Sequence, residues 1–549
     1  MPDQPWLALY PAGVPSLVPV RHRSLIDAWA ERVAANPDAV AVAYFDGTLS
    51  ARELDAASDA LAAAWQSMGT RRGDRVGVYL QNIPQYPIIL LALWKLGATA
   101  LVLNPMYRRQ ELRRLIDDSE ASGLICSDAS VDELAETLAG STVGWLVSTS
   151  SLDYQTRNDP RIFASVERFA PAPDGDLLYL LEKFRGARPE PVDVNLDDVA
   201  LLAYTSGTTG PPKGAMNTHG NLLAVIGSYS TWISLGPDDA VLAVAPLFHI
   251  TGAVINASIA LLTGATLVLA NRFQAEVMLE AFAEHRVTFT IGSITAFNAI
   301  YALPQASREH FATVKLLYSG GAPIPPTTVE RFQERFGVYI HNVYGMTETT
   351  SAVIAVPPAT PAPVHEPSGT LTVGVPLPGL SARVVNPAGV ELKPGEQGEL
   401  ELSGPQVVPG YWHRPGETEQ AMPRGRLRTG DGAIIDEQGW VYLVDRLKDQ
   451  INVSGYKVWP REVEDALYEH PAVHEAAVVG LPDEYRGETV VAYVSLKAGA
   501  TAAEDELIVF VRERLAPYKC PRVVHLVEEL PKTQTGKIRR NVLRDGGTA

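Results

Sequence analysis

The chain has 549 residues, of which 46% are hydrophobic and 20% charged, and its formal net charge is −17. This length exceeds that of a usual single domain and predicts two or more domains. The composition is that of an ordinary globular protein, and the negative charge argues against general nucleic-acid binding.

Cysteine content and the N-terminus bear on the compartment. Only Cys126 and Cys520 are present, which argues against a disulfide framework or a zinc cluster and favours a reducing compartment. The first fifteen residues contain no basic segment followed by an apolar core, so we expect no signal peptide. The sequence therefore predicts a cytoplasmic protein.

A charge-free stretch between Asp239 and Arg272 is long enough to cross a bilayer. It is interrupted by Pro246, His249 and Asn256 and by a turn at 263–265. These interruptions favour a strand, a buried helix over 254–262 and a second strand over 266–270. We therefore expect no transmembrane segment.

The N-terminal part alternates between strands and helices. A capping box at 50–53 begins a helix whose apolar residues recur at helical spacing, and Gly69 lies where this helix would end. Strands over 75–80 and 99–103 flank a helix over 86–96. This alternation predicts a parallel, doubly wound sheet.

A loop rich in glycine and hydroxyl residues follows a predicted strand over 199–203. It consists of Tyr204, Thr205, Ser206, Gly207, Thr208, Thr209, Gly210, Pro211, Pro212, Lys213 and Gly214. Glycines let backbone N–H groups point at one spot, hydroxyls add donors and Lys213 adds a positive charge, so the loop suits a polyphosphate. It is not a Walker A loop, because Gly214 follows Lys213 and the glycine spacing differs. Alone, such a loop is equally typical of a flexible surface loop.

Two apolar segments follow a predicted helix over 217–230. The first, at 245–252, contains Phe248, His249 and Gly252. A single histidine in an apolar segment is more often a core residue than a functional one. The second is a predicted strand over 315–319 that ends in a turn made by Gly320, Gly321, Ala322 and Pro323.

A strand predicted over 338–343 leads into Tyr344, Gly345, Met346, Thr347 and Glu348. The aromatic face of Tyr344 could stack on a purine, and Thr347 could donate to an α-phosphate. Glu348 is a hard oxygen ligand suited to Mg²⁺, which takes one or two carboxylates together with phosphate oxygens.

A Pro-rich loop or linker at 357–369 precedes a small β subdomain. Strands over 380–385, 398–403 and 407–411, separated by Gly and Pro turns, predict this subdomain. Asp431, in the segment 429–431, could accept both ribose hydroxyls, as acidic residues do at other nucleotide sites; the alternative is an ordinary turn aspartate.

The C-terminal part mixes helical and strand patterns. Helices are expected over 460–469 and 504–515, and strands near 476–479 and 490–496. The tail contains Pro531, Lys532, Thr533, Gln534, Thr535, Gly536 and Lys537. A basic tail of this kind is usually solvated.

Five segments of the chain, in this order, resemble the motifs of the adenylate-forming superfamily of acyl-CoA synthetases, peptide-synthetase adenylation domains and beetle luciferases. They are the loop at 204–214, the segments 344–348, 429–431 and 445–449, and the tail at 531–537. The resemblance implies an α/β multidomain fold. A large N-terminal adenylation domain (1–447) of doubly wound sheets would include a small β-barrel subdomain (375–447). A small, mobile α+β C-terminal domain (448–549) would turn about a hinge at Lys448.

The resemblance also implies roles for the matched residues. The catalytic residues would be Lys213, His249, Thr347, Glu348 and Lys537, with Glu348 as the Mg²⁺ ligand and Lys537 as a mobile lysine. The expected ATP or AMP site comprises Thr205, Ser206, Gly207, Thr208, Thr209, Gly210, Lys213, Gly321, Ala322, Pro323, Asn342, Tyr344, Gly345, Thr347, Asp431, Arg446 and Lys537. The acyl pocket would be walled by Phe248, His249, Gly252, Gly320 and Gly321, and the pantetheine tunnel lined by Ser454, Gly455 and Tyr456.

The implied reaction has two steps. A carboxylate attacks the α-phosphate of ATP and releases pyrophosphate, and the acyl-adenylate then passes to a thiol with release of AMP. Coenzyme A is the expected thiol, because residues 512–544 contain nine Lys or Arg against three glutamates, an excess that could attract its phosphates. An acyl carrier protein presents the same pantetheine and is the main alternative.

The acid is expected to be uncharged beyond its carboxylate. The segment 245–252 lacks the aspartate that usually holds the substrate ammonium in peptide-synthetase domains, so an amino acid would bury an unpaired cation. A medium- or long-chain fatty acid is the first expectation and an aryl acid the second. A luciferase-like oxygenase and a non-catalytic nucleotide or acyl sensor are remote alternatives, and the presence of Lys537 and Glu348 argues against the sensor. We expect a monomer or a homodimer.

Overall fold

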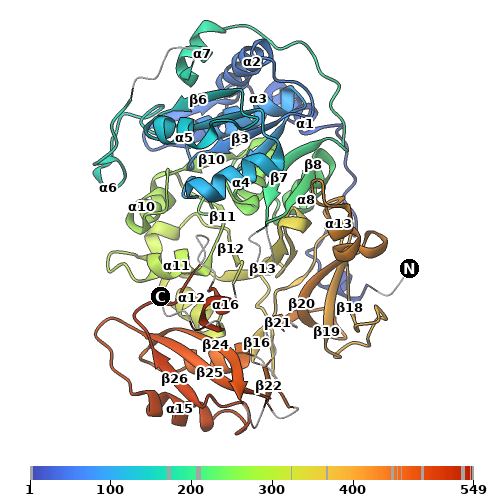
Figure 1. Cartoon of the computed structure of the whole chain (residues 1–549), viewed down its shortest axis with the longest axis vertical. Coiled ribbons are helices and arrows are strands. Elements are labelled where there is room, and N and C mark those ends of the chain that lie inside the picture. Colours follow the sequence, from blue (N-terminus) through green and yellow to red (C-terminus); the bar gives the residue numbers. More distant parts are fainter. Residues whose placement is uncertain are drawn as a thin grey trace.

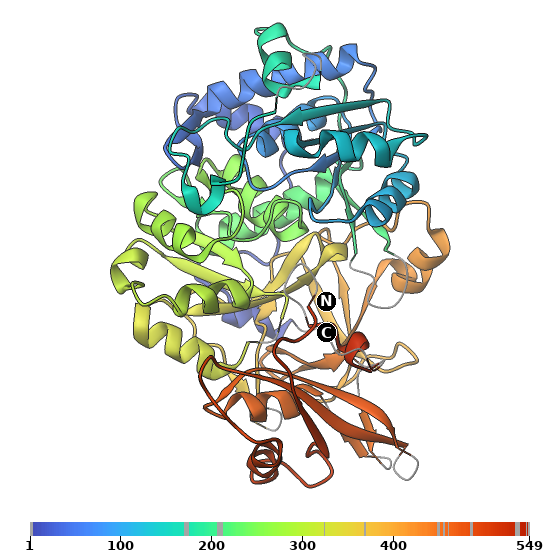
Figure 2. The same ribbon diagram turned by 60° about the vertical axis from the view of Figure 1, so that its left-hand side comes forward.

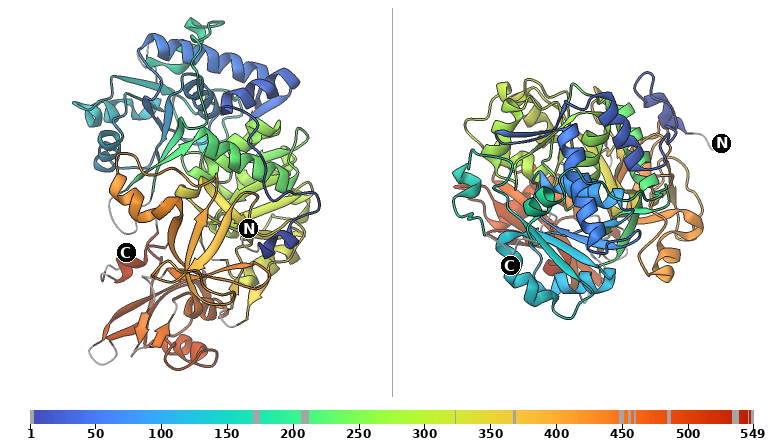
Figure 3. Two further views of the ribbon diagram at one scale, coloured as in Figure 1. Left: turned by 90° about the vertical axis from the view of Figure 1, so that its right-hand side faces the viewer. Right: turned by 90° about the horizontal axis from the view of Figure 1, so that it is seen from above.

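The computed structural model (Figure 1) describes the chain except for residues 1–3, 170–174, 206–211, 323, 367–368, 447–450, 454–455, 459, 484–486, 533–537, 545 and 547–549. Two α/β sheets form the upper and middle parts of the view, and a β subdomain lies beside them. The C-terminal residues form a separate unit at the end of the molecule opposite α2 and α7 (Figures 2 and 3).

The first sheet has six strands in the order β6-β5-β3-β4-β7-β8. Its neighbours are parallel except β8, which returns antiparallel to β7. The bounds are β3 Arg75–Tyr79, β4 Thr99–Val102, β5 Gly123–Ser127, β6 Trp145–Thr149, β7 Val199–Tyr204 and β8 Gly214–Thr218. The loop that suits a polyphosphate connects the last two strands of this sheet.

The second sheet has nine strands in the order β17-β14-β13-β12-β11-β9-β10-β1-β2. Its strands from β13 to β1 are parallel to one another. At the edges, β2 pairs antiparallel with β1, β14 with β13, and β17 with β14. The bounds are β1 Val40–Tyr44, β2 Gly47–Ser50, β9 Ala240–Leu242, β10 Thr266–Leu269, β11 Phe289–Gly292, β12 Leu316–Gly320, β13 Ile340–Met346, β14 Ser351–Ala355 and β17 Val375–Pro376. The predicted doubly wound α/β fold is confirmed.

Helices connect and cover the two sheets. They are α1 Leu25–Ala35, α2 Ala51–Ser67, α3 Gln85–Lys95, α4 Arg109–Ser119, α5 Val131–Leu138, α6 Pro160–Phe163, α7 Leu177–Lys183, α8 His219–Ile233, α9 Ile259–Thr263, α10 Ala275–Glu284, α11 Ile294–Tyr301 and α12 Pro326–Phe336. The capping box predicted at the start of α2 is present, since the Ser50 and Glu53 side chains each bond the other residue's backbone N–H. No helix in the described ranges is both long and apolar enough to cross a membrane.

The β subdomain is a four-stranded antiparallel sheet in the order β18-β19-β20-β21. Its strands are Ser381–Val385, Gly398–Ser403, Leu427–Ile435 and Val441–Arg446, and α13 spans Pro415–Ala421. The predicted linker contains part of a short hairpin, β15 Val364–His365 with β16 Thr370–Leu371. One hydrophobic cluster runs from Trp6 to Val444 and joins this subdomain to both sheets.

The C-terminal unit has a sheet in the order β23-β22-β25-β24, with β26 also paired to β25. Its elements are β22 Ile451–Val453, β23 Tyr456–Val458, α14 Pro460–Tyr468, β24 Val473–Asp483, β25 Gly487–Leu496, α15 Glu504–Arg512, β26 Val523–Leu526 and α16 Arg540–Arg544. Two hydrophobic clusters, with buried members between Ile451 and Leu543, belong to this unit alone. This separation of cores is compatible with the boundary predicted at 447/448, which stays a prediction.

Two local predictions are wrong. Residues 214–218 form β8 and not the start of a helix, because they pair with β7; the helix begins at His219, where the side chain of Thr218 accepts from Asn221 N. Residues 407–411 do not form a strand of the β subdomain; Tyr411 instead makes an isolated antiparallel bridge with Ala215 of β8. The buried helix predicted at 254–262 is confirmed, although its first part, Gly252–Ser258, is a π-helix that precedes α9.

Candidate active site

The β7–β8 hairpin holds the two ends of the expected phosphate loop. Thr205 N donates to Lys213 O at 2.9 Å, and Lys213 N donates to Thr205 Oγ1 at 3.4 Å. The predicted Ser206, Gly207, Thr208, Thr209 and Gly210 lie outside the described residues. Lys213 forms no ion pair within the described ranges, so its ammonium is available to an anion.

Glu348 lies in the 3-10 turn Thr347–Thr349 that follows β13, and it is only 6% exposed. Tyr411 Oη donates to Glu348 Oε1 at 2.7 Å, and Lys213 Nζ lies 5.2 Å from the centre of the Tyr411 ring. Burial raises the pKa of Glu348, while the Tyr411 hydroxyl and the Lys213 charge lower it. Three segments of the chain therefore meet at one buried carboxylate.

Tyr344 and Asp431 form the neighbouring contact. Tyr344 Oη donates to Asp431 Oδ2 at 2.6 Å, which links β13 to β20 of the β subdomain. Asp431 N donates to Thr429 Oγ1 at 3.2 Å, and Gly430 between them has a φ of +73°, which favours glycine. The backbone of Asp431 pairs with that of Arg446, so two residues expected at the nucleoside lie on adjacent strands.

Close backbone approach explains two of the glycines next to the site. A Cβ on Gly345 would lie 2.0 Å from Ser351 O, and a Cβ on Gly320 would lie 2.6 Å from Val343 O. Gly321 has a φ of +81°, and Ala322 follows it. The side chain of Asn342 is used within the protein, because its amide donates to Thr372 O at 3.0 Å. Pro323 is outside the described residues.

The expected acyl wall begins where β9 runs toward the π-helix. Phe248 is buried and His249 is half-buried; Thr251 N donates to His249 Nδ1 at 3.3 Å. A Cβ on Gly252 would lie 2.0 Å from Pro246 O. Ser351 Oγ donates to Thr251 Oγ1 at 3.3 Å, which ties this wall to the segment that follows Glu348.

The flanks of the expected catalytic tail are held within the C-terminal unit. Lys532 and Ile538 form an antiparallel bridge, and Arg539 N donates to Pro531 O at 2.7 Å. Ion pairs join Lys532 to Glu475 and Arg540 to Glu464. Lys537, Lys448, Ser454 and Gly455 are not among the described residues, and neither are the side chains of Arg446 and Tyr456.

The basic excess over 512–544 is partly neutralised inside the unit. Among the described residues, at least four of its nine cations pair with glutamates of the same unit, namely Arg514, Lys519, Lys532 and Arg540. The attraction expected for the CoA phosphates therefore depends on fewer charges than the sequence count suggests.

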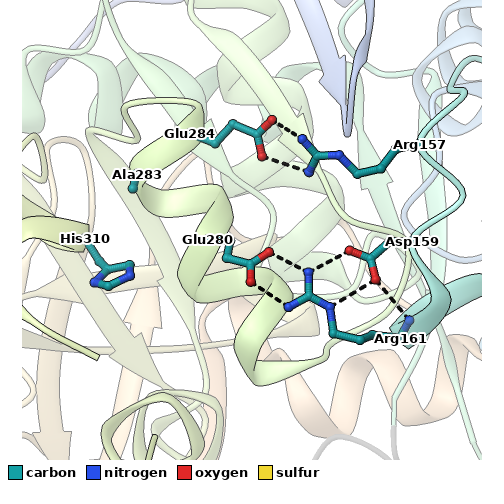
Figure 4. A pocket seen from close by; sticks show the side chains of 7 residues that line it. All are labelled: Arg157, Asp159, Arg161, Glu280, Ala283, Glu284 and His310. Carbon is teal, nitrogen blue, oxygen red and sulfur yellow. Dashed lines mark hydrogen bonds and ion pairs between the residues drawn. The ribbon is translucent and has the colours of Figure 1, made fainter. Parts of the chain in front are cut away.

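A pocket elsewhere on the surface is filled by its own ion pairs (Figure 4). Arg157 pairs with Glu284, and Arg161 pairs with Glu280 and Asp159. Because both arginines already have carboxylate partners, this pocket is a poor candidate for binding an anionic nucleotide.

Comparison with known proteins agrees with this geometry. A family model described as AMP-binding enzyme matches residues 29–412, and one described as AMP-binding enzyme C-terminal domain matches residues 462–537. The chain belongs to the AMP-binding enzyme family.

Relatives in the AMP-binding enzyme family extend over the whole chain. A long-chain-fatty-acid–CoA ligase of Escherichia coli O6:H1 is 34% identical, covering 98% of each chain. A feruloyl-CoA synthase of Amycolatopsis sp is also 34% identical, covering 93% of this chain and 97% of its own. The crystal structure of ATP-bound MatB from Rhodopseudomonas palustris has a TM-score of 0.83 and 29% identity, covering 95% of this chain and 98% of its own. The predicted superfamily and the enzyme class, an AMP-forming carboxylic acid–CoA ligase, are confirmed.

The sequence analysis missed Tyr411 and Asn217 in this AMP-binding enzyme. Asn217 Nδ2 donates to Thr347 O at 3.0 Å and to Thr350 Oγ1 at 3.1 Å, so it supports the turn that carries Glu348. The sequence signal for both was weak, since Tyr411 ended a predicted strand and Asn217 began a predicted helix.

Proposed function

We propose that the protein activates a long-chain fatty acid with ATP and transfers it to coenzyme A. The observation that carries this proposal is the convergence of Lys213, Glu348, Tyr344 and Asp431 from three segments of the chain, with Tyr344 and Glu348 in the same segment. A positive charge, a buried carboxylate and an acidic residue that can accept from ribose hydroxyls, contributed by three different sheets, suit a magnesium nucleotide.

In the first step a carboxylate approaches the negatively charged triphosphate of ATP, so the site has to offset the repulsion between these two anions. The carboxylate oxygen of the acid bonds to the α-phosphorus, the bond to the bridging oxygen breaks and pyrophosphate leaves. Lys213 and the donors of the phosphate loop would stabilise the phosphates, and Thr347 would hold the α-phosphate. Asp431 and Arg446 would position the nucleoside, and Lys537 would come from the C-terminal unit.

Glu348 fits the predicted Mg²⁺ site. Its carboxylate is buried, and Tyr411 is the one side chain that donates to it in the described part of the chain. One carboxylate together with phosphate oxygens is a usual Mg²⁺ environment. When bound, the ion would supply positive charge to the phosphate oxygens.

The second step forms the thioester. The thiol sulfur bonds to the acyl carbon, its proton is lost, and the carbon–oxygen bond to AMP breaks. The segment 454–456 would line the pantetheine path after the C-terminal unit turns about Lys448. A carrier-protein thiol is the alternative acceptor and an outcome of the test below.

The choice of acid is supported by the apolar wall and by the relatives. Phe248 and Gly252 are both buried, and none of the residues predicted for the pocket carries a carboxylate or an ammonium. Several of the similar proteins are named long-chain-fatty-acid–CoA ligases, whereas the feruloyl-CoA synthases favour an aryl acid as second candidate.

The deciding experiment measures pyrophosphate release and thioester formation with a panel of acids. The panel contains fatty acids of increasing chain length and a hydroxycinnamic acid, each with and without CoA. We expect the highest kcat/KM for a long-chain fatty acid with CoA. Turnover of the aryl acid alone, or transfer only to a carrier protein, would overturn the proposed substrate or acceptor, and no pyrophosphate with any acid would overturn the activity.

A further inference from the structure

The segment 406–412, which follows β19 and precedes α13, joins the two charged parts of the candidate site. Toward the Glu348 turn, Val408 N donates to Glu348 O at 2.9 Å and Thr350 Oγ1 donates to Gln406 O at 2.9 Å. Toward β8, Met216 N donates to Gly410 O at 3.1 Å and Trp412 N donates to Gly214 O at 2.8 Å. The segment therefore bridges the strand after the phosphate loop and the turn that carries Glu348.

Tyr411 lies where this bridge passes between the two charges. It is 7% exposed, its hydroxyl donates to Glu348 Oε1 at 2.7 Å, and Lys213 Nζ lies 5.2 Å from its ring centre. The hydroxyl of Tyr411 therefore binds the carboxylate of Glu348, and its aromatic ring lies against the ammonium of Lys213. Tyr411 keeps Lys213 and Glu348 near the same place without letting them neutralise each other as a direct ion pair.

The Glu348 turn does not depend on this hydroxyl for its backbone path. Asn217 Nδ2 holds Thr347 O and Thr350 Oγ1 independently, and Val408 N holds the Glu348 carbonyl. What the Tyr411 hydroxyl adds is the orientation of the carboxylate itself, because the three hydrogen bonds named above act on two backbone carbonyl oxygens and on a threonine hydroxyl.

We propose that Tyr411 is a positioning residue for the first half-reaction. Its hydroxyl holds the Glu348 carboxylate in the orientation that receives magnesium-bound ATP, and its ring holds the Lys213 ammonium close by until a phosphate takes its place. The inference rests on the proposed function, since it assigns to Glu348 the magnesium nucleotide of that reaction.

The test compares Tyr411→Phe with Tyr442→Phe. Both remove a phenol hydroxyl that donates to a carboxylate, but Tyr442 bonds Asp436 at 3.2 Å within the β subdomain. Calorimetric titration with ATP, once with magnesium and once with EDTA and no acid present, measures nucleotide binding without turnover. We expect Tyr411→Phe to weaken magnesium-dependent ATP binding by about tenfold, the scale of one lost hydrogen bond to a charged group, and to leave binding in EDTA unchanged.

A second measurement tests whether Tyr411 acts through the carboxylate of Glu348. In a Glu348→Gln background the Tyr411→Phe change should cost little further, because the oriented charge is already gone. Steady-state kinetics should show the loss in pyrophosphate release, with thioester formation from preformed acyl-adenylate and the KM for CoA unchanged.

The outcomes separate this inference from the proposed function. If the wild-type protein never releases pyrophosphate, the proposed function fails. If it does, and Tyr411→Phe binds ATP as Tyr442→Phe does in both solutions, the inference is overturned. The inference is also overturned if the effects of Tyr411→Phe and Glu348→Gln on ATP binding are additive in the double variant. It is overturned as well if Tyr411→Phe does not fold, because the hydroxyl would then be required for the fold.

Discussion

Two buried histidines lie in the elements that carry the candidate site, and they make the fold sensitive to acid. His219 is the first residue of α8, directly after β8, and its Nδ1 accepts a bond from Leu25 N at 3.2 Å. His341 lies in β13, three residues before Tyr344, with the Tyr339 ring 4.8 Å away. Burial lowers the pKa of each histidine from 6.5 to about 4, because the charged form would lose its hydration.

The sign and size of the effect follow from these two pKa values. Below pH 6.5 the unfolded chain binds protons at both positions while the folded chain does not, so the free energy of unfolding falls as the pH drops toward 4. Between about pH 7 and about pH 5, each histidine accounts for a loss of about 2 kcal/mol. Together they remove about 4 kcal/mol, a large part of the stability of a typical domain.

The assay is chemical denaturation at about pH 7 and about pH 5, followed by tryptophan fluorescence. His341→Phe keeps an aromatic ring against Tyr339 and cannot titrate, so we expect its loss between the two pH values to be about 2 kcal/mol smaller than that of the wild type. His474→Gln, at an exposed position, is the control and should keep the wild-type pH dependence. If His341→Phe lost as much stability as the wild type, the attribution to a buried neutral histidine would be refuted.

Three further changes test other parts of the molecule. Lys537→Ala should slow pyrophosphate release roughly 10²–10³-fold, the scale of one lost transition-state donor, yet affect thioester formation from preformed acyl-adenylate much less; equal losses in both assays would contradict its role. Gly345→Ala should destabilise the protein by about 1–3 kcal/mol in thermal unfolding, because the added Cβ would lie 2.0 Å from Ser351 O. The control Gly236→Ala should leave the stability unchanged, because no atom lies within 4 Å of its added Cβ. Arg32→Met should cost about 3 kcal/mol, because the buried guanidinium donates to four carbonyl oxygens at the end of α9, and an unchanged melting temperature would contradict this.

The sequence predicted most of the regular elements, and the resemblance supplied the expected site residues, for different physical reasons. Helix α2 and strands β3 and β4 follow from capping and from local apolar patterns, and they were predicted to within a residue or two at each end. Lys213 and Glu348 were singled out because glycine loops and hard oxygen ligands have recognisable chemistry. Their closeness in space, by contrast, required the structure.

Tyr411 shows why the rest could not be predicted. Its local pattern, a short apolar segment among glycine and proline residues, is typical of a strand in the β subdomain, and that is where the sequence analysis placed it. Its actual partners, Ala215 and Glu348, lie far away along the chain. Long-range pairing of this kind leaves no trace in a local pattern, and the same reason explains why Asn217 was predicted in a helix and not in β8.

The bridge through Tyr411 also restricts how the site can change between two half-reactions. Main-chain bonds tie β8, the Glu348 turn and the segment 406–412 together, so Lys213 and Glu348 cannot separate without breaking that network. The C-terminal unit has its own hydrophobic clusters, and the Lys532–Glu475 and Arg540–Glu464 pairs brace the base of the tail within it. A change of chemistry between steps is therefore easier to achieve by turning this unit as a whole than by rearranging the nucleotide site. An interlocked nucleotide site and a C-terminal unit with its own core are compatible with the predicted hinge at Lys448, which would deliver Lys537 in one step and the 454–456 segment in the other.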